Sequence, residues 1–299
     1  MQEKSKPNFI IIGAMKAATT SLYTYLKQHP DVFMTHIKEP MFFNNLNQKN
    51  DFIIKGKKTK KITSLDDYYA LFNKVKKEKA IGEASPAYIY NTQCASLIKK
   101  HLPNTKIIAI LRQPVERAYS NYLHAKRADR EPLTNFEDAF NSEEDRIKQK
   151  WSPLYHYKSK GFYYKQLKRY YNTFPENQIK IILFEDISVK PKKIIKEIFD
   201  FLEIENQFIP NTSKKANVSG NPKGVLGWVI MKMRKYNRIP NIEFRKILPK
   251  FIVNIILEEI YQKPKKISRK LVSKLTKKYY MEDIKNLEKL IKRDLSNWL

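Results

Sequence analysis

The 299-residue sequence predicts an α/β fold in which helices flank a parallel central sheet, with a helical C-terminal extension at about residues 225–299. Two observations predict this class. Short apolar runs without polar alternation recur along the chain, which is typical of strands buried on both faces. Segments with apolar residues at helical spacing separate these runs, and such alternation favours a parallel sheet with right-handed crossovers.

The elements follow this alternation in order. Residues 8–12 form a continuous apolar run that ends in glycine, and residues 17–28 show helical spacing before the stop at His29-Pro30. Further buried strands are expected at 79–82, 106–111 and 178–184. Further helices are expected at 92–101, 114–128, 162–171, 191–202 and 281–299.

The chain shows no internal repeat and no linker rich in glycine or serine, so residues 1–299 are expected to form a single domain. A polar, lysine-dense region at about 44–78 and a highly charged one at about 127–160 indicate surface insertions. Loops of this kind often carry substrate contacts.

The charge balance is strongly basic, because 58 Lys and Arg outnumber 30 Asp and Glu and give a formal charge of +28. Such a field attracts nucleic acid, anionic glycans, phosphorylated cofactors and lipid headgroups, although a lysine-rich solvated surface accounts for it equally well. The single cysteine, Cys94, excludes an intramolecular disulfide and a thiolate metal site.

No stretch approaches the roughly 20 apolar residues needed to span a bilayer. Lys16 interrupts the first apolar run too early for a secretory signal, so we expect a soluble, cytoplasmic protein with no removed segment. Peripheral membrane contact through the basic, apolar region 225–261 stays open, and the sequence does not indicate the oligomeric state.

Residues 13–21 connect the first strand to the first helix, which is where unpaired backbone N–H groups and the helix dipole favour an anion. The loop offers a positive charge, two small residues and three hydroxyl groups, namely Lys16, Ala17, Ala18, Thr19, Thr20 and Ser21. The alternative is a hydroxyl-capped helix beside a solvent-exposed lysine.

This loop departs from the Walker A pattern G-x-x-x-x-G-K-[ST]. Counted from Gly13, the second glycine is Ala18, the Walker lysine is Thr19, and the lysine has moved forward to Lys16. The departure weakens the case for ATP or GTP with magnesium, so a kinase or NTPase of the same fold is a minor alternative.

Residues 9–22 (FIIIGAMKAATTSL) resemble the 5′-phosphosulfate-binding motif of sulfotransferases that use 3′-phosphoadenosine 5′-phosphosulfate (PAPS). The branch is that of the heparan sulfate sulfotransferases and their bacterial relatives, and it implies a P-loop NTPase-like fold. Segments 38–43 (KEPMFF), 82–88 (GEASPAY), 161–163 and 184–186 follow in the family's order, and 280–284 and 294–299 resemble the bacterial members' ending.

Residues 107–120 (IIAILRQPVERAYS) resemble the family's 3′-phosphate motif, in which Arg112 and Ser120 would bind the phosphate. An arginine fork beside a hydroxyl suits a phosphate monoester, although alone the segment also fits an ordinary strand-to-helix turn. Residues 217–223 resemble the late loop that closes on the nucleotide, and Lys223 is the candidate contact, with the choice among Ser219 to Gly224 open. Tyr163 is a further nucleotide-binding candidate.

The resemblance implies sulfuryl transfer from PAPS to a hydroxyl, leaving 3′-phosphoadenosine 5′-phosphate (PAP), with no metal expected. Lys16 would stabilise the departing oxygens, and Glu39 would be the base. Glu39 could instead form an ion pair with Lys38 or Arg112. The rival bases are His36, His124 and His156.

The acceptor expected from the resemblance is a glycan or other carbohydrate-containing molecule; a lipid, a small metabolite or a peptide tyrosine stays open. A basic nucleic-acid-binding protein is the alternative from another class, but the sequence contains no recognised nucleic-acid motif, so no specific nucleic-acid partner is expected.

Overall fold

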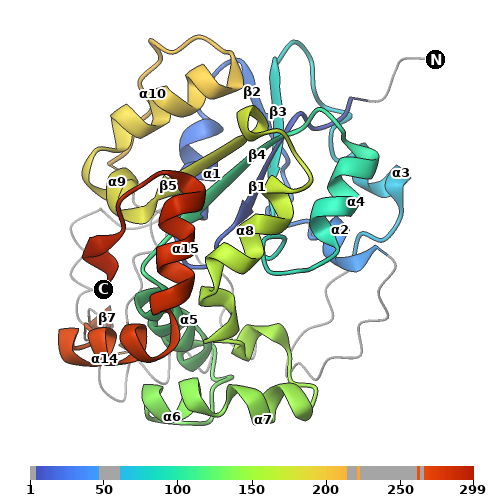
Figure 1. Ribbon diagram of the computed structural model, residues 1–299. Coiled ribbons are helices and arrows are strands. Elements are labelled where there is room, and N and C mark those ends of the chain that lie inside the picture. Colours follow the sequence, from blue (N-terminus) through green and yellow to red (C-terminus); the bar gives the residue numbers. More distant parts are fainter. Residues whose placement is uncertain (1–4, 47–60, 214–220, 223–260, 263–265) are drawn as a thin grey trace.

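The computed structural model describes residues 5–46, 61–213, 221–222, 261–262 and 266–299. Within them a sheet of five parallel strands has the order β2-β3-β1-β4-β5 (Figure 1). The strands are β1 (Phe9–Gly13), β2 (Val32–Met34), β3 (Ala80–Ala84), β4 (Lys106–Leu111) and β5 (Ile179–Leu183). The predicted α/β class with a parallel central sheet is confirmed, and the first strand of the chain lies at its centre.

The core of the sheet explains the unbroken apolar runs. Every residue of β1 is buried, and so is every residue of β4 except Lys106, because helices cover both faces. Gly82 pairs with Phe9 across β3 and β1, and a Cβ at Gly82 would lie 2.2 Å from the Phe9 ring. Glycine is therefore required where this ring crosses the neighbouring strand.

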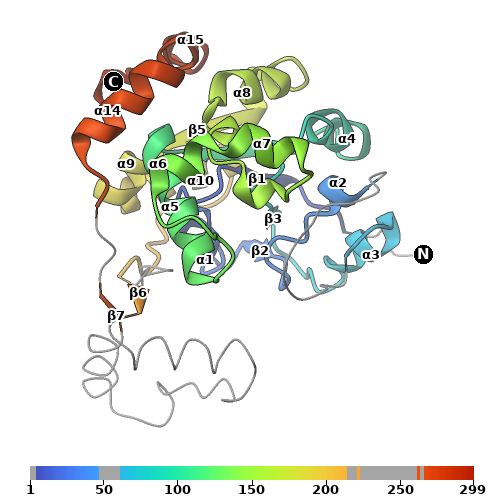
Figure 2. The same ribbon diagram turned by 90° about the horizontal axis from the view of Figure 1, so that it is seen from below.

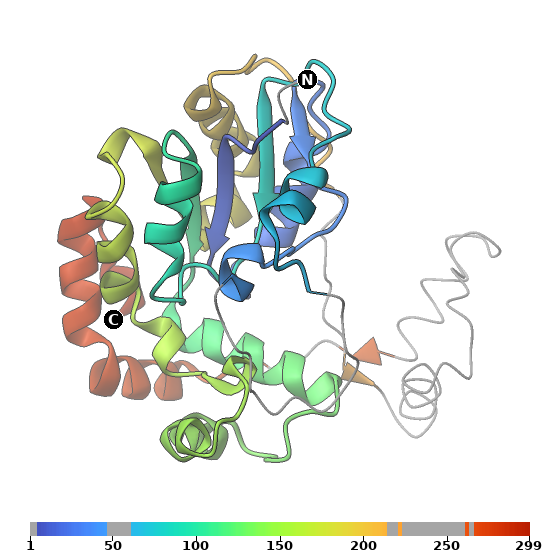
Figure 3. The same cartoon turned by 90° about the vertical axis from the view of Figure 1, so that its right-hand side faces the viewer.

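Two layers of helices enclose the sheet (Figures 1 and 3). One face is covered by α4 (Cys94–His101), α8 (Tyr163–Tyr171) and α15 (Met281–Ile291), and the other by α1 (Thr19–Leu26) and α10 (Pro191–Leu202). Helix α14 (Arg269–Tyr279) packs on α5 (Pro114–Arg127), and α15 packs on α8. The last helices of the chain therefore belong to the same folded body as the sheet (Figure 2).

Region 127–160 is a packed part of the protein. It contains α6 (Phe136–Asn141) and α7 (Glu143–Lys148), which lie with α5 beyond the carboxyl ends of the strands (Figure 1). Arg146 forms a buried ion pair of 2.7 Å with Glu131, which also accepts a 2.7 Å hydrogen bond from the Tyr157 hydroxyl. Shorter helices are α2 (Phe42–Asn45), α3 (Leu65–Ala70) and α9 (Phe184–Val189).

Several elements differ from the prediction, and three of the differences have a local cause. Helix α1 begins at Thr19, because Lys16 and Ala18 adopt left-handed conformations, each with φ of 67°. Strand β2 was not predicted, since its three residues are too few to show a period. The last helix ends at Ile291, where Lys292 turns left-handed, and only a 3₁₀ turn at Ser296–Trp298 follows.

Much of the predicted helical extension lies outside the described residues, because 223–260 and 263–265 are not among them. The same holds for Lys223 and for the candidates at Ser219, Gly220 and Gly224. Among the described residues, no helix is both long enough and apolar enough to cross a bilayer.

Candidate active site

The loop between β1 and α1 lies at the carboxyl edge of the sheet. The backbone N–H of Ala14 donates a 2.7 Å hydrogen bond to the carbonyl of Ile110, so this loop and the end of β4 are held together. Lys16 and Ala18 are left-handed, and no side chain caps α1. The first N–H groups of α1 therefore have no partner from the helix or from a capping side chain, and an anion can accept from them.

The side chains of this loop differ in burial. Ala17 is fully buried, and Thr19 is only 5% exposed, so both fix the loop on the core. Thr20 and Ser21 are half-buried in the first turn of α1, where their hydroxyl groups can donate to a bound anion. Among Ala17, Thr19, Thr20 and Ser21, the two half-buried residues are therefore the ones whose side chains can reach a ligand.

Arg112 follows β4 directly, at the same edge. Its guanidinium lies over the ring of Phe184, 4.5 Å from the centroid, and pairs with Glu116 at 3.0 Å. The stacking fixes the plane of the guanidinium, as a bidentate phosphate contact requires. Ser120 lies half-buried in the second turn of α5, the helix that begins just after Arg112.

Glu39 is carried by a segment with two left-handed residues, Glu39 at φ 60° and Met41 at φ 53°. The Glu39 N–H donates to the carbonyl of Ala84 at 3.1 Å, and the Met41 N–H donates to the Ser85 hydroxyl at 3.0 Å. The Glu39 carboxylate is 38% exposed and forms an ion pair with Lys38. The sequence left open an ion pair of Glu39 with Lys38 or with Arg112, and the structure shows the pair with Lys38.

The buried carboxylate of Glu83 lies behind the segment that carries Glu39 and holds it through hydrogen-bonded hydroxyl groups. The sequence predicted no role for Glu83. Its side chain is fully buried and accepts hydrogen bonds from the hydroxyl groups of Ser85 (2.8 Å), Tyr88 (2.8 Å) and Tyr68 (3.2 Å). Burial raises the pKa of Glu83 to about 7, against the three hydroxyl donors, which lower it. The feature of the sequence that could have drawn attention to Glu83 is an acidic residue within a largely buried strand.

The hydroxyl groups around Glu83 also contact the segment that bears Glu39. Ser85 donates to Glu83 and accepts from the Met41 N–H, while Tyr88 donates to Glu83 and accepts from the Phe43 N–H at 3.3 Å. Glu83 thus orients both hydroxyl groups that hold the backbone on either side of α2's start. Glu83 therefore supports the backbone of the segment that carries Glu39.

Lys16 is close enough to the other charged residues of the site for their charges to shift its pKa. Burial, followed by the charge of Arg127, lowers the pKa of Lys16 to about 8, while Glu39 raises it and Arg112 and Lys38 lower it. The residues predicted from three separate segments therefore share one electrostatic environment. Such a lysine takes up a proton when an anion binds beside it.

The three rival histidines differ in their surroundings. His36 is exposed, and His156 is paired through Nδ1 with the Tyr90 hydroxyl at 2.8 Å. Partial desolvation, then the charges of Lys16, Arg127 and Arg130, lower the pKa of His124 to about 4, so His124 is the histidine that shares the electrostatic environment of Lys16. A base with so low a pKa is weak near neutrality.

Tyr163 lies at the start of α8 and is fully buried. Its hydroxyl donates to the backbone carbonyl of Arg112. Tyr163 therefore lies behind the edge of the sheet and contacts Arg112, the residue predicted to bind the 3′-phosphate. Burial raises the pKa of Tyr163 to about 12, and the hydroxyl stays a donor at neutral pH.

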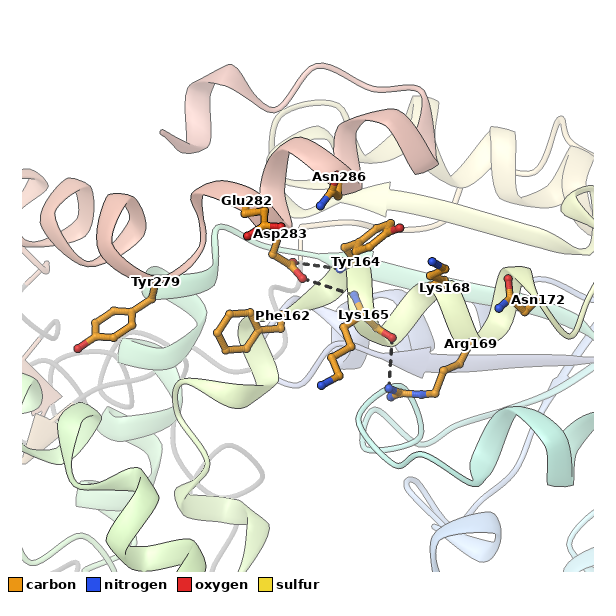
Figure 4. A pocket seen from close by; sticks show the side chains of 10 residues that line it. All are labelled: Phe162, Tyr164, Lys165, Lys168, Arg169, Asn172, Tyr279, Glu282, Asp283 and Asn286. Atoms are coloured by element: carbon orange, nitrogen blue, oxygen red, sulfur yellow. Dashed lines mark hydrogen bonds between the residues drawn. The ribbon is translucent and has the colours of Figure 1, made fainter.

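A groove of about 520 Å³ lies elsewhere, between α8 and α15 (Figure 4). Tyr164, Lys165 and Lys168 contribute to one wall and Asp283 to the other. Asp283 accepts from the N–H groups of Tyr164 (3.0 Å) and Lys165 (3.4 Å) and so caps α8. None of the predicted site residues lines this groove.

Comparison with known proteins agrees with the motifs. Residues 6–223 match the family model described as the sulfotransferase domain, and the chain belongs to the sulfotransferase family. A solved sulfotransferase from Alicyclobacillus acidocaldarius is 31% identical, with a TM-score of 0.74, over 98% of this chain and 99% of that one. The family resemblance and the P-loop-like parallel fold are confirmed.

Curated relatives are more distant. The membrane-associated sulfotransferase kil1 of Dictyostelium discoideum is 28% identical over 67% of this chain and 56% of its own length. Heparan sulfate glucosamine 3-O-sulfotransferase 3B1 of Mus musculus is 28% identical over 73% of this chain and 54% of its own length. The chain spans about half the length of these curated relatives.

Proposed function

We propose that the protein transfers the sulfuryl group of PAPS to a hydroxyl group of an acceptor and releases PAP. The observation that carries this proposal is that Lys16, Arg112 and Glu39, from three segments, share one edge of the sheet and one electrostatic environment. The loop after β1 supplies N–H and hydroxyl donors for a 5′-phosphosulfate, and Arg112 with Ser120 supplies donors for a 3′-phosphate.

The reaction breaks the bond between sulfur and the oxygen of the 5′-phosphate and forms a bond between sulfur and the acceptor oxygen. Glu39 takes the acceptor proton, for which its carboxylate must leave Lys38 and face the acceptor. Lys16 stabilises the negative charge that grows on the departing phosphate, and its effect on rate depends on how much stronger that contact becomes in the transition state.

The identity of the donor can be tested before the acceptor is known. Calorimetry with 3′,5′-ADP and with ordinary ADP compares two ligands that differ in the position of one phosphate. Because Arg112 and Ser120 would bind only a 3′-phosphate, 3′,5′-ADP should bind more tightly, by roughly tenfold or more for a charge-assisted pair of contacts. Equal affinities would overturn the proposed donor.

We propose a carbohydrate hydroxyl as the acceptor. The similarity to heparan sulfate sulfotransferases and the formal charge of +28 support an anionic glycan. Transfer of label from ³⁵S-labelled PAPS to a panel of glycan, lipid, small-metabolite and peptide-tyrosine acceptors distinguishes these four classes. Labelling of the lipid, metabolite or peptide class with none of the glycans would refute the proposed acceptor and leave the proposed donor intact.

A further inference from the structure

A small cavity lies beneath the loop that carries Lys16, on the side of α5 and α8. Its volume is about 10 Å³, which is at the lower limit for holding one water molecule. The polar side chains around it are Arg117, Lys160, Tyr90 and Gln166, and Met15 of the loop closes it. Two of these side chains are cationic, and both are almost completely removed from solvent.

Arg117 is the first of the two cations. It is fully buried on α5, and its Nη2 donates to the backbone carbonyl of Tyr157. Its Nε and Nη1 have no hydrogen-bond partner among the described residues, and neither does Oε1 of Gln166. Buried donors are almost always paired, and leaving them unpaired is costly. The two free N–H groups therefore indicate an occupant of the cavity.

Lys160 is the second cation and is only 5% exposed. Its Nζ lies 3.2 Å from the sulfur of Met15 and 5.7 Å from the centroid of the Tyr90 ring. No carboxylate of the described residues lies within ion-pair distance of it. Burial, then the charge of Arg117, lowers the pKa of Lys160 to about 7.

One buried carboxylate, Glu143, offsets part of this charge from a distance, since it raises the pKa of Lys160. Its own oxygens accept from the N–H groups of Lys158 and Ser159 and from the Ser159 hydroxyl. With Arg117 and Lys160 both protonated, the cluster keeps one uncompensated positive charge. Burying an unpaired charge is expensive.

We propose that this cavity binds one monovalent inorganic anion of halide size, held by the free N–H groups of Arg117 and by the ammonium group of Lys160. A water molecule could accept from the same donors and donate to Oε1 of Gln166, but while Lys160 is protonated it would leave one positive charge uncompensated. Met15 and Lys160 are unbranched side chains and can make room for an ion somewhat larger than water. The site is separate from the proposed donor site, because it lies beneath the loop and uses neither Arg112 nor Ser120.

Thermal unfolding in sodium chloride and in sodium gluconate of equal ionic strength tests the proposal. Chloride should raise Tm in a saturable manner, because a ligand that binds only the folded state stabilises it. Lys160→Met should abolish this difference or raise the half-saturating chloride concentration at least roughly tenfold. Lys165→Met, at an exposed lysine of α8, is the matched control and should respond as the wild type does. A Lys160→Met response equal to that of the wild type would overturn the proposal.

Bromide gives a direct readout that needs no variant, which matters because substitution of Arg117 could prevent folding. Crystals of the wild-type protein grown or soaked in sodium bromide should show an anomalous peak within hydrogen-bond distance of Arg117 Nε or Nη1. A well-ordered water at that position without anomalous signal would show that the cavity holds water only, and the proposal would be wrong.

Discussion

The phenolic hydroxyl of Tyr163 donates a 2.9 Å hydrogen bond to the backbone carbonyl oxygen of Arg112. This contact joins the first residue of α8 to the residue that leaves β4 at the edge of the sheet. The two residues are 51 positions apart, and the chain between them includes α5 and region 127–160, so the bond connects distant parts of the chain. It fixes the backbone from which the Arg112 guanidinium reaches the proposed 3′-phosphate.

Tyr163→Phe should therefore weaken the nucleotide site without removing a ligand from it. The lost hydroxyl leaves a carbonyl without its partner, at a cost of about 1–3 kcal/mol in the free energy of unfolding. Affinity for 3′,5′-ADP should fall, but less than in Arg112→Ala. Calorimetry and chemical denaturation measure the two effects. Tyr164→Phe, in the groove of Figure 4, is the matched control, and an equal loss there would contradict the prediction.

Binding of 3′,5′-ADP should depend on the protonation of Lys16. Its pKa of about 8 in the free protein means that the ammonium form prevails below pH 8 and the neutral amine above it. A phosphate prefers the ammonium, so affinity should be constant below this pH and fall by up to about tenfold per unit above it. Calorimetry across this pH range measures the decline.

Lys16→Arg provides the control for this pH dependence, because a guanidinium stays charged throughout the range. Whatever its absolute affinity, the variant should lack the decline above pH 8. A wild-type affinity that is flat with pH would show that Lys16 does not contact the phosphate.

Glu39→Gln should abolish most turnover while leaving donor binding intact. The amide cannot accept the acceptor proton, and general bases contribute about 10²–10⁴-fold to rate. Transfer from ³⁵S-labelled PAPS at saturating acceptor should fall by that factor, with affinity for 3′,5′-ADP changed by no more than about twofold. His124→Asn tests the rival base, and near-normal turnover of Glu39→Gln with loss in His124→Asn would reassign the role.

Glu83 should make the protein less stable as pH rises. Its pKa is about 7 in the folded state against 4.5 for an unperturbed glutamate, so the folded state holds the proton more tightly. The penalty is absent below pH 4.5, grows up to pH 7 and is complete above it, at roughly 3 kcal/mol.

Glu83→Gln carries no titrating carboxylate and isolates this effect. The difference in unfolding free energy between variant and wild type should shift in favour of the variant between pH 4.5 and 7. Urea denaturation at several pH values measures it. A difference that does not change with pH would mean that Glu83 titrates normally.

Ala18→Gly should relieve strain in the loop. Ala18 adopts φ of 67°, and this conformation costs an L-residue about 1–2 kcal/mol but costs glycine almost nothing. We expect Tm to stay level or rise, since the added freedom of the unfolded chain offsets part of the gain. Ala18→Val should lower Tm, because a branched side chain tolerates this conformation poorly; equal Tm values for both variants would contradict the assignment.

The sequence predicted the elements with strong local signals. Strands β1 and β4 lie where their apolar runs predict them, because a strand buried on both faces consists of consecutive apolar residues. The loop between β1 and α1 also lies where its sequence pattern predicts it. Lys16, Arg112 and Glu39 were expected to act together because their segments resemble three motifs of one family.

Long-range packing gave the features that the sequence did not predict. Nothing local reveals that the Tyr163 hydroxyl meets the Arg112 carbonyl or that three hydroxyl groups surround Glu83. The left-handed conformations of Ala18 and Met41 were not predicted either, because neither residue is a glycine. At such positions the tertiary structure imposes a backbone conformation that the local sequence disfavours.

The central position of β1 has a consequence for biosynthesis. Strand β1 is synthesised before the other four strands of the sheet, and it pairs with β3 and β4, whose residues follow about 70 and 100 positions later. Until both have emerged, the FIIIG segment is an apolar strand with two unpaired edges, which is a hazard for aggregation. Every pairing of the sheet is distant in sequence, so folding should be slow, and the nascent chain should depend on protection of the segment that contains β1.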